Sequence, residues 1–265
     1  VRSRRQRQMC IRDRGKTTVT VNLSVALHRA GHQVMVVDLD PQSALRFHFN
    51  LDLEHPGGLS RAAIDGTPWR DACVQSESGV VVLPFGEVGE SEREQIELAI
   101  HHDPDWLLRH LQAMGLSQDA IVLLDTPPGA SVYLRQALQV AHAALVVALP
   151  DAGSYATLPG MERLLQTYCA GRPDFVGSGY VINQMDASRQ LARDVAGVLR
   201  QDLGERLAAV VHQDASVGEA VAFRRSIFDY APHSLAAQDF ATCVQWLQAR
   251  FDTGTTRADP SAHSA

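Results

Sequence analysis

Four consecutive residues near the start of the chain have the types and spacing that phosphate binding requires. Gly15, Lys16, Thr17 and Thr18 match the second half of the pattern Gly-x-x-x-x-Gly-Lys-Ser/Thr, and an apolar helical pattern follows directly. In such a loop the backbone N–H groups surround a phosphate, the lysine balances its charge and the hydroxyl ligates a divalent cation. The sequence therefore predicts an anion site at the N-terminus of a helix.

The first half of this loop is missing from the sequence. The pattern needs a glycine where Cys10 stands, and a buried apolar strand should lead into the loop, but the chain begins VRSRRQRQMC. Either the loop has decayed, or residues 1–14 are foreign, a fusion or assembly scar joined to a truncated gene. We favour the second interpretation, because strand and loop vanish together before an intact helix. Residues 1–14 are thus predicted to be non-native or disordered.

Polar side chains follow several apolar runs further along the chain. Asp38 and Asp40 belong to DLDPQ, Asp125 begins DTPPG, and Asn183 follows another apolar run. In open α/β sheets the carboxyl ends of the strands form the ligand-binding edge. An aspartate that ends a strand beside a phosphate loop can hold Mg²⁺. A single such aspartate is more often a turn former, but the joint occurrence of the three motifs favours a site.

The hydrophobic pattern indicates how these residues are positioned. Continuous apolar runs, typical of strands buried on both faces, alternate with amphipathic helical patterns, which predicts an α/β fold with a doubly wound, mostly parallel sheet flanked by helices. Its first strand is missing or replaced. We expect one domain over residues 15–252 and a disordered polar tail over 253–265. The predicted strands are 34–38, 80–83, 121–124, 144–149, 180–182 and 208–211, and the predicted helices are 17–30, 106–114, 131–140, 161–169, 188–203 and 235–251.

Composition restricts the class of protein. The net charge of -6 argues against general affinity for nucleic acid. The four cysteines are scattered without a metal-binding or disulfide pattern, which fits a reducing cytoplasm. The longest apolar run, AALVVAL at 143–149, is too short to cross a bilayer. We therefore expect a cytoplasmic protein with no specific nucleic acid partner and no direct membrane insertion.

Taken together, GKTT-x-x-x-NL, V-x-x-V-D-x-D-P-Q and D-T-P-P resemble the ParA/MinD family of P-loop ATPases with a deviant Walker motif. The resemblance covers the chain from Gly15 to about Phe251. It implies ATP and Mg²⁺ as cofactors and a homodimer that forms on ATP binding. Within the loop, it implies that Lys16 contacts the β- and γ-phosphates, that Thr17 ligates Mg²⁺ and that Thr18 contacts the α-phosphate.

The resemblance also implies roles for the residues at the strand ends. Asp40 would polarise the attacking water, Asp38 would support the metal shell and the loop lysine, and Asp125 would hold Mg²⁺. Asn183 would hydrogen-bond adenine, although an asparagine at a strand end can also serve only to cap a turn. These assignments make Asp40, Lys16 and Asp38 the candidate catalytic residues.

One departure from the family concerns a second, signature lysine, expected where Ile11 stands. In relatives that lysine reaches the partner's nucleotide across the dimer. Asp13 also replaces a loop glycine and would place a carboxylate against the phosphates. This chain is therefore expected to bind ATP poorly and to dimerise through it even less well, unless the native gene restores strand and loop.

A further stretch, LSRAAIDGTPWRDACVQSESGVVVLPFGEV at 59–88, resembles the BcsQ (YhjQ) type of ATPase from bacterial cellulose-synthase operons. That resemblance implies an ATP-dependent switch acting with accessory proteins of the cellulose synthase complex at the cytoplasmic membrane face, with recruitment to the inner membrane or cell pole through partners. A non-catalytic scaffold and a ParA-like partition ATPase remain alternatives. Physically, Trp69 and Phe85 are expected to be core anchors and Asp65-Gly66 a turn.

Overall fold

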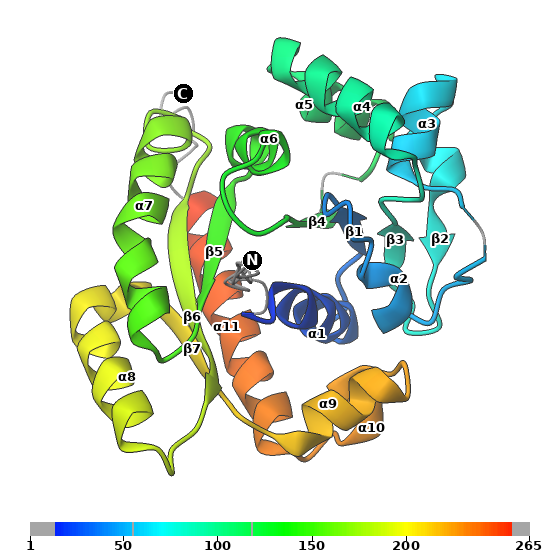
Figure 1. Ribbon diagram of the computed structural model, residues 1–265. Coiled ribbons are helices and arrows are strands. Elements are labelled where there is room, and N and C mark those ends of the chain that lie inside the picture. The colour runs from blue at the N-terminus through cyan, green and yellow to red at the C-terminus, as the bar shows by residue number, and fades with distance from the viewer. Residues whose placement is uncertain (1–13, 55, 118, 256–265) are drawn as a thin grey trace, which may run out of the picture.

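A computed structural model of the chain describes residues 14–54, 56–117 and 119–255, with side chains described up to Phe251 (Figure 1). The predictions for Cys10, Ile11 and Asp13, and most of the predicted tail, lie outside these residues. The strands are β1 (Val34–Asp38), β2 (Val74–Gln75), β3 (Val81–Leu83), β4 (Ile121–Asp125), β5 (Ala143–Ala148), β6 (Gly177–Met185) and β7 (Leu207–His212). The α-helices are α1 (Lys16–Arg29), α2 (Leu45–His48), α3 (Leu59–Asp65), α4 (Glu90–His102), α5 (Trp106–Ala113), α6 (Val132–Val140), α7 (Ala152–Tyr168), α8 (Gln190–Leu203), α9 (Ala215–Ala222), α10 (Ile227–Tyr230) and α11 (Leu235–Thr255), and two 3₁₀-helices are η1 (Trp69–Ala72) and η2 (Gly204–Arg206).

The strands form a mostly parallel arrangement with helices on both sides, which confirms the predicted fold class (Figure 1). Hydrogen bonds divide them into two sheets, ordered β2-β3-β1-β4 and β5-β6-β7, and the short β2 is the antiparallel member. Within the described residues, β4 and β5 are edge strands of their sheets. The prediction that the first strand is missing or replaced concerns a part of the chain outside those residues.

The strand β1 shows why its sequence is continuously apolar. Val34 and Val36 pack into the core formed with α1 and α11, whereas Met35 and Val37 pack into a second core formed with α3, α4 and α5. Because side chains alternate across a strand, both faces must be hydrophobic when helices cover both. Burial of this apolar surface is the main stabilising contribution to the fold.

The predicted core anchors are buried. Trp69 and Phe85 are 2% and 1% exposed, and Trp69 stacks on His110 of α5 with a centroid distance of 4.4 Å. The Asp65-Gly66 turn is also confirmed, because α3 ends at Asp65. The BcsQ-like stretch therefore supplies packing residues for the α3–α5 side of the molecule.

Several elements differ from the sequence-based expectation. The short helices α2, α3, α9 and α10 were not among the predicted elements, and several predicted elements have different bounds; β6, for example, spans 177–185 rather than 180–182. The helix α7 begins at Ala152 rather than Met161, because Asp151 Oδ1 caps it by accepting a hydrogen bond from Ser154 N at 2.6 Å. The edge strand β2 was not predicted, since two residues are too short for a periodic pattern. The helix α11 continues to Thr255, beyond the predicted end at Phe251.

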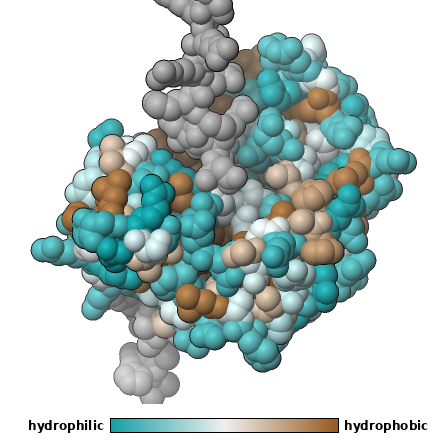
Figure 2. All heavy atoms as spheres, turned by 60° about the horizontal axis from the view of Figure 1, so that its bottom comes forward, coloured by the Kyte–Doolittle hydropathy of each residue, from teal (hydrophilic) through white to brown (hydrophobic). Residues whose placement is uncertain are grey.

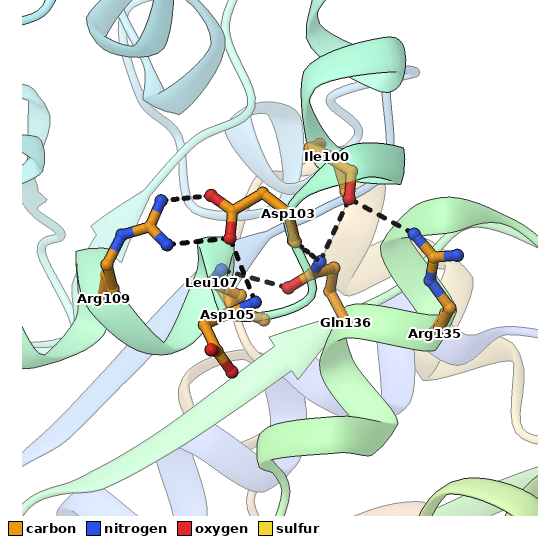
Figure 3. Close-up of polar contacts among 7 residues, drawn as sticks. All are labelled: Ile100, Asp103, Asp105, Leu107, Arg109, Arg135 and Gln136. Atoms are coloured by element: carbon orange, nitrogen blue, oxygen red, sulfur yellow. Dashed lines mark hydrogen bonds and ion pairs between the residues drawn. The ribbon is translucent and has the colours of Figure 1, made fainter.

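The α4–α5 turn is joined to α6 by a group of polar side chains (Figure 3). Gln136 of α6 accepts a hydrogen bond from Leu107 N at 3.1 Å and donates to the carbonyls of Ile100 and Asp103 at 3.3 and 2.6 Å. Arg109 pairs with both carboxylate oxygens of Asp103. The backbone groups at this turn are thereby satisfied, which fixes the position of α6.

The surface is mixed in character. On the face shown in Figure 2, hydrophobic side chains are dispersed among hydrophilic ones, and Phe223, at 66%, is an example of an exposed aromatic residue. Isolated exposed apolar residues are normal on a protein surface. None of the helices in the described part of the chain has both the length and the hydrophobicity needed to span a membrane.

We expect Gly58→Ala to destabilise the protein. A Cβ atom on Gly58 would lie 2.5 Å from Gly86 N and 2.6 Å from Pro84 O, so the backbone would have to move. Overpacking of this kind costs about 1–3 kcal/mol, measurable by chemical denaturation. Gly171→Ala is the matched control, since no heavy atom lies within 4 Å of a Cβ built there. Equal stability of the two variants would contradict the tight backbone approach.

Candidate functional site

The predicted phosphate loop ends in a glycine with a conformation that suits few other residues. Gly15 precedes α1 with φ 73° and ψ 30°, and a Cβ atom there would lie 2.5 Å from Asn183 Nδ2. Both the left-handed backbone and this close approach favour glycine. In the described part of the chain, α1 has no side-chain N-cap, and its first turn contains no acidic residue. Such a helix start is suited to an anion.

Helix α1 places two hydroxyl groups on the carboxylate that ends β4. Thr17 Oγ1 donates a 2.7 Å hydrogen bond to Asp125 Oδ2, and Thr20 Oγ1 lies 3.4 Å from Asp125 Oδ1. Asp125 is only 3% exposed. Thr20 was missed in the sequence analysis, although its i, i+3 spacing from Thr17 places both residues on one helix face.

A second carboxylate lies beside the first. The register of the parallel pair β1–β4 places Asp38 opposite Asp125, and Leu39 N donates to Asp125 O at 2.8 Å. Asp38 is fully buried, and its Oδ1 accepts a hydrogen bond from Asp40 N at 3.0 Å. Its Oδ2 is buried without a hydrogen-bond partner among the described residues. Such an orphaned oxygen is uncommon in a protein interior.

Both carboxyl groups have raised pKa values. Burial raises the pKa of Asp38 well above its usual value, and the charge of Asp125 raises it further. Burial also raises the pKa of Asp125 to about 6, against the opposing effects of the Thr17 hydroxyl and the Lys16 ammonium group. The site therefore favours a proton or a cation between these groups.

Asp40 lies at the mouth of the same site. Its Oδ1 accepts a hydrogen bond from Gln42 N at 3.0 Å, and its carbonyl accepts one from Ser43 N at 2.8 Å. These bonds form a turn directly after β1. The charge of Asp40 contributes to the raised pKa values of both Asp38 and Asp125, so the structure brings the three predicted aspartates together.

The remaining predicted residues lie around the start of α1. Asn183, 5% exposed, donates from Nδ2 to Arg14 O at 2.8 Å. The carbonyl of Thr18 accepts a 2.9 Å bond from Asn22 Nδ2, and Asn22 Oδ1 accepts one from Ile227 N, also at 2.9 Å. Asn22, part of the GKTT-x-x-x-NL motif, thus anchors α1 to α10. The roles of Asn183 and Thr18 toward a nucleotide stay predictions.

The LPFG segment at 83–86, which begins at the last residue of β3, reaches the same edge of the sheet. A cavity of about 820 Å³ lies between the turn after Asp40 and the loop after β3, and its lining includes Gln42, Arg46, Phe85 and Gly86. One wall of this cavity is therefore the segment that carries Asp40. The LPFG segment therefore contributes both to the surroundings of the site and to the hydrophobic core.

The donor set fits Mg²⁺ bound together with phosphates. Thr17 Oγ1 and Asp125 Oδ2 are hard oxygen atoms 2.7 Å apart, and the unpartnered Asp38 Oδ2 lies in the neighbouring strand. Across residues 14–54, 56–117 and 119–255, no group of three or more His, Cys, Asp or Glu side chains is arranged to hold a metal. Mg²⁺ commonly needs only one or two protein oxygens when substrate phosphates complete its shell.

Comparison with known proteins places this geometry in a family context. A family model described as "Cellulose biosynthesis protein BcsQ" matches residues 10–247. The chain is 31% identical over 240 residues to the cellulose biosynthesis protein BcsQ of Salmonella typhimurium, covering 88% of each chain. It is 30% identical over 243 residues to the chromosome-partitioning ATPase Soj of Thermus thermophilus, covering 89% of this chain and 91% of that protein.

A solved structure supports the same fold. The septum site-determining protein MinD of Pyrococcus horikoshii, solved in complex with Mg-ADP, superposes with a TM-score of 0.70 at 24% identity. The match covers 91% of this chain and 93% of that one. At this level of identity the likeness concerns the fold.

We expect Thr17→Val to destabilise the nucleotide-free protein by about 1–3 kcal/mol, because a buried carboxylate oxygen of Asp125 loses its hydroxyl donor. Thr17→Ser keeps the hydroxyl and should preserve most of the stability. The measurement is the free energy of unfolding of both variants in denaturant at pH 7.5. If Thr17→Val were as stable as Thr17→Ser, the hydrogen bond to Asp125 would not contribute.

We expect Asp38→Asn to stabilise the protein in the absence of nucleotide and Mg²⁺. Because both carboxyl groups have raised pKa values in the folded state, the wild type loses stability as the pH rises from about 4 through 6. Removing one charge should raise the melting temperature at pH 7.5 by about 2–4 °C for about 1 kcal/mol.

The pH profile provides the control for this variant. The decline in melting temperature between pH 4.5 and 7.5 should be shallower in Asp38→Asn than in the wild type. Asp65→Asn, an exposed aspartate at the end of α3, should leave the profile unchanged. A wild-type slope in Asp38→Asn would show that the two carboxylates do not repel each other.

Proposed function

Because the chain belongs to the BcsQ family of cellulose biosynthesis proteins, we propose that it is an ATP-binding and ATP-hydrolysing switch that assists the bacterial cellulose synthase complex. The observation that carries the proposal is the contact of Thr17, at the start of α1, with Asp125, which lies beside Asp38. The hydrogen bond between Thr17 and Asp125 would place an anion site, at the start of α1, next to a cation site, at the buried carboxylates. A nucleotide triphosphate with a divalent cation has the complementary charges.

Each residue of the loop has a proposed part in binding. Lys16 would contact the β- and γ-phosphates, Thr18 the α-phosphate, and Asn183 the adenine side of the nucleotide. Thr17 and Asp125 would hold Mg²⁺. When bound, Mg²⁺ neutralises the phosphate oxygens and orients them for transfer.

The aspartates of the DLDPQ segment have the proposed catalytic part. Asp40 is half-buried at the mouth of the site and would orient and polarise the attacking water. Asp38 is buried behind it and hydrogen-bonded to its backbone, so Asp38 would hold the Asp40 segment and balance the charge of the metal shell. The alternation of a buried and a half-buried carboxylate supports this division of roles.

The proposed cellular role depends on ATP joining two subunits. The homodimer would expose a surface for accessory proteins of the cellulose synthase complex at the cytoplasmic membrane face, and hydrolysis would release them. This is a switch controlled by contacts to the γ-phosphate. Recruitment to the inner membrane or cell pole would follow from those partners. The names of the BcsQ relatives support the pathway, and the Mg-ADP complex of MinD supports the cofactors.

In a chain whose first strand and phosphate loop have been restored, we expect Lys16→Ala to abolish ATP binding and Asp40→Ala to keep binding but lower turnover by about 10²–10³-fold, since the first removes phosphate contacts and the second removes a group needed in the transition state. Binding is measured by calorimetry and turnover by phosphate release, both with Mg²⁺. Asp65→Asn serves as the control for both assays.

The two variants also separate the alternatives. Wild-type turnover in both variants would exclude the proposed site. Nucleotide binding without measurable turnover in a chain whose first strand and phosphate loop have been restored would support a non-catalytic scaffold instead. Binding by Lys16→Ala with unchanged affinity would show that the loop lysine does not contact the phosphates.

A further inference from the structure

The strand β6 has an irregularity where it reaches the start of α1. Its pairing with β7 shifts register between Ile182 and Met185, and Gln184 has φ 55°. The left-handed conformation is unfavourable for a side chain such as glutamine, and bulges next to active sites commonly redirect a side chain. The position is therefore one where the backbone tolerates strain to place Gln184.

The bulge brings two carboxamides to one place. Successive side chains of a regular strand point to opposite faces. Here, however, a Cβ atom built on Gly15 would lie 2.5 Å from Asn183 Nδ2 and 3.6 Å from Gln184 Nε2. Both amide groups thus lie against the glycine of the predicted phosphate loop.

The two carboxamides differ in burial and in hydrogen bonding. Asn183 is buried and its Nδ2 is bonded to Arg14 O. Gln184 is exposed, and its side chain makes no hydrogen bond to any other residue that the structure describes. Gln184 therefore has a free donor and a free acceptor at the edge of the proposed nucleotide site.

A free carboxamide has a specific complement. Its N–H group and carbonyl oxygen match the N6 donor and the N7 acceptor of adenine, whereas the corresponding edge of guanine offers two acceptors. A phosphate offers acceptors alone and would use only the N–H group. The chemistry of the side chain thus favours a purine base with an amino group.

We propose that Gln184 hydrogen-bonds the base of the bound nucleotide and sets a preference for adenine over guanine. This inference rests on the proposed nucleotide-binding function. Asn183, which also bonds Arg14 O, would contact the adenine side as proposed above, and Gln184 would supply the selectivity.

The test uses the full chain and a signal from Lys16. Lys16 is the only lysine in the sequence, so its acetylation by an amine reagent gives one modified lysine peptide in mass spectrometry. The nucleotide concentration that halves this acetylation, with Mg²⁺ present, measures apparent affinity for unlabelled ATP and for GTP. The method remains usable when binding is weak.

In Gln184→Ala we expect the concentration of ATP needed for half-protection to rise about tenfold, because a bidentate base contact is lost, while that of GTP changes less than about twofold. Gln184→Gly should lose the same selectivity but melt at a higher temperature than Gln184→Ala, since glycine accepts the left-handed backbone. Gln201→Ala, an exposed glutamine of α8, is the control and should behave as the wild type.

Two outcomes would overturn the inference alone. An equal loss of affinity for ATP and GTP in Gln184→Ala would assign the side chain to the phosphates or to loop structure. An unchanged ratio of the two affinities in both Gln184 variants would show that the side chain does not recognise the base. Protection of the wild-type Lys16 by neither nucleotide would instead overturn the proposed function, and this inference with it.

Discussion

The structure depends on one unfavourable contact, the adjacency of two buried carboxylates at the ends of β1 and β4. Apolar burial on both faces fixes the register of these strands, and that register places Asp38 opposite Asp125. Neither residue can move away without shifting a strand whose alternate side chains fill two separate cores. The electrostatic cost is therefore imposed by packing, and it is reduced by the Thr17 hydroxyl, by Lys16 and by a proton or a cation. A group of this kind is stabilised most by a ligand that brings positive charge.

The helices around the site are held in place by buried polar contacts. Asn22 links α1 to the start of α10, so the helix that carries Thr17 is fixed relative to the second half of the chain. Gln136 links α6, which follows the Asp125 loop, to the α4–α5 turn (Figure 3). Hydrogen bonds of this type contribute little net stability when satisfied but are costly to leave unmade. They therefore specify the arrangement of the helices, while apolar burial supplies the stability.

The sequence was informative where one physical rule determines the outcome. Continuous apolar runs predicted the buried strands. Because parallel strands place their carboxyl ends at one edge of a sheet, the sequence also predicted that Asp38, Asp40 and Asp125 lie close together. It was less informative where local geometry decides. Nothing in the letters of β6 shows that Gln184 occupies a left-handed conformation, because the bulge arises from pairing with β7. The start of α7 was missed because the cap at Asp151 lies ahead of the periodic apolar pattern.

Two of the four non-glycine residues with positive φ in the described part of the chain lie at this edge, whereas the other two, Asn50 and Arg224, are hydrogen-bonded to each other. Ser43, with φ 50°, lies in the turn after Asp40, and Gln184, with φ 55°, lies against Gly15. Each is a non-glycine residue in a conformation that costs about 1–2 kcal/mol, and neither position gains a side-chain hydrogen bond within the described residues that would offset this cost. Backbone strain that no local hydrogen bond offsets is typical of residues at ligand-binding sites. Because Ser43 follows β1 and Gln184 lies in β6, which belong to different sheets, a ligand that contacts both must reach from one sheet to the other, as a nucleotide with a phosphate chain at one end and a base at the other would do.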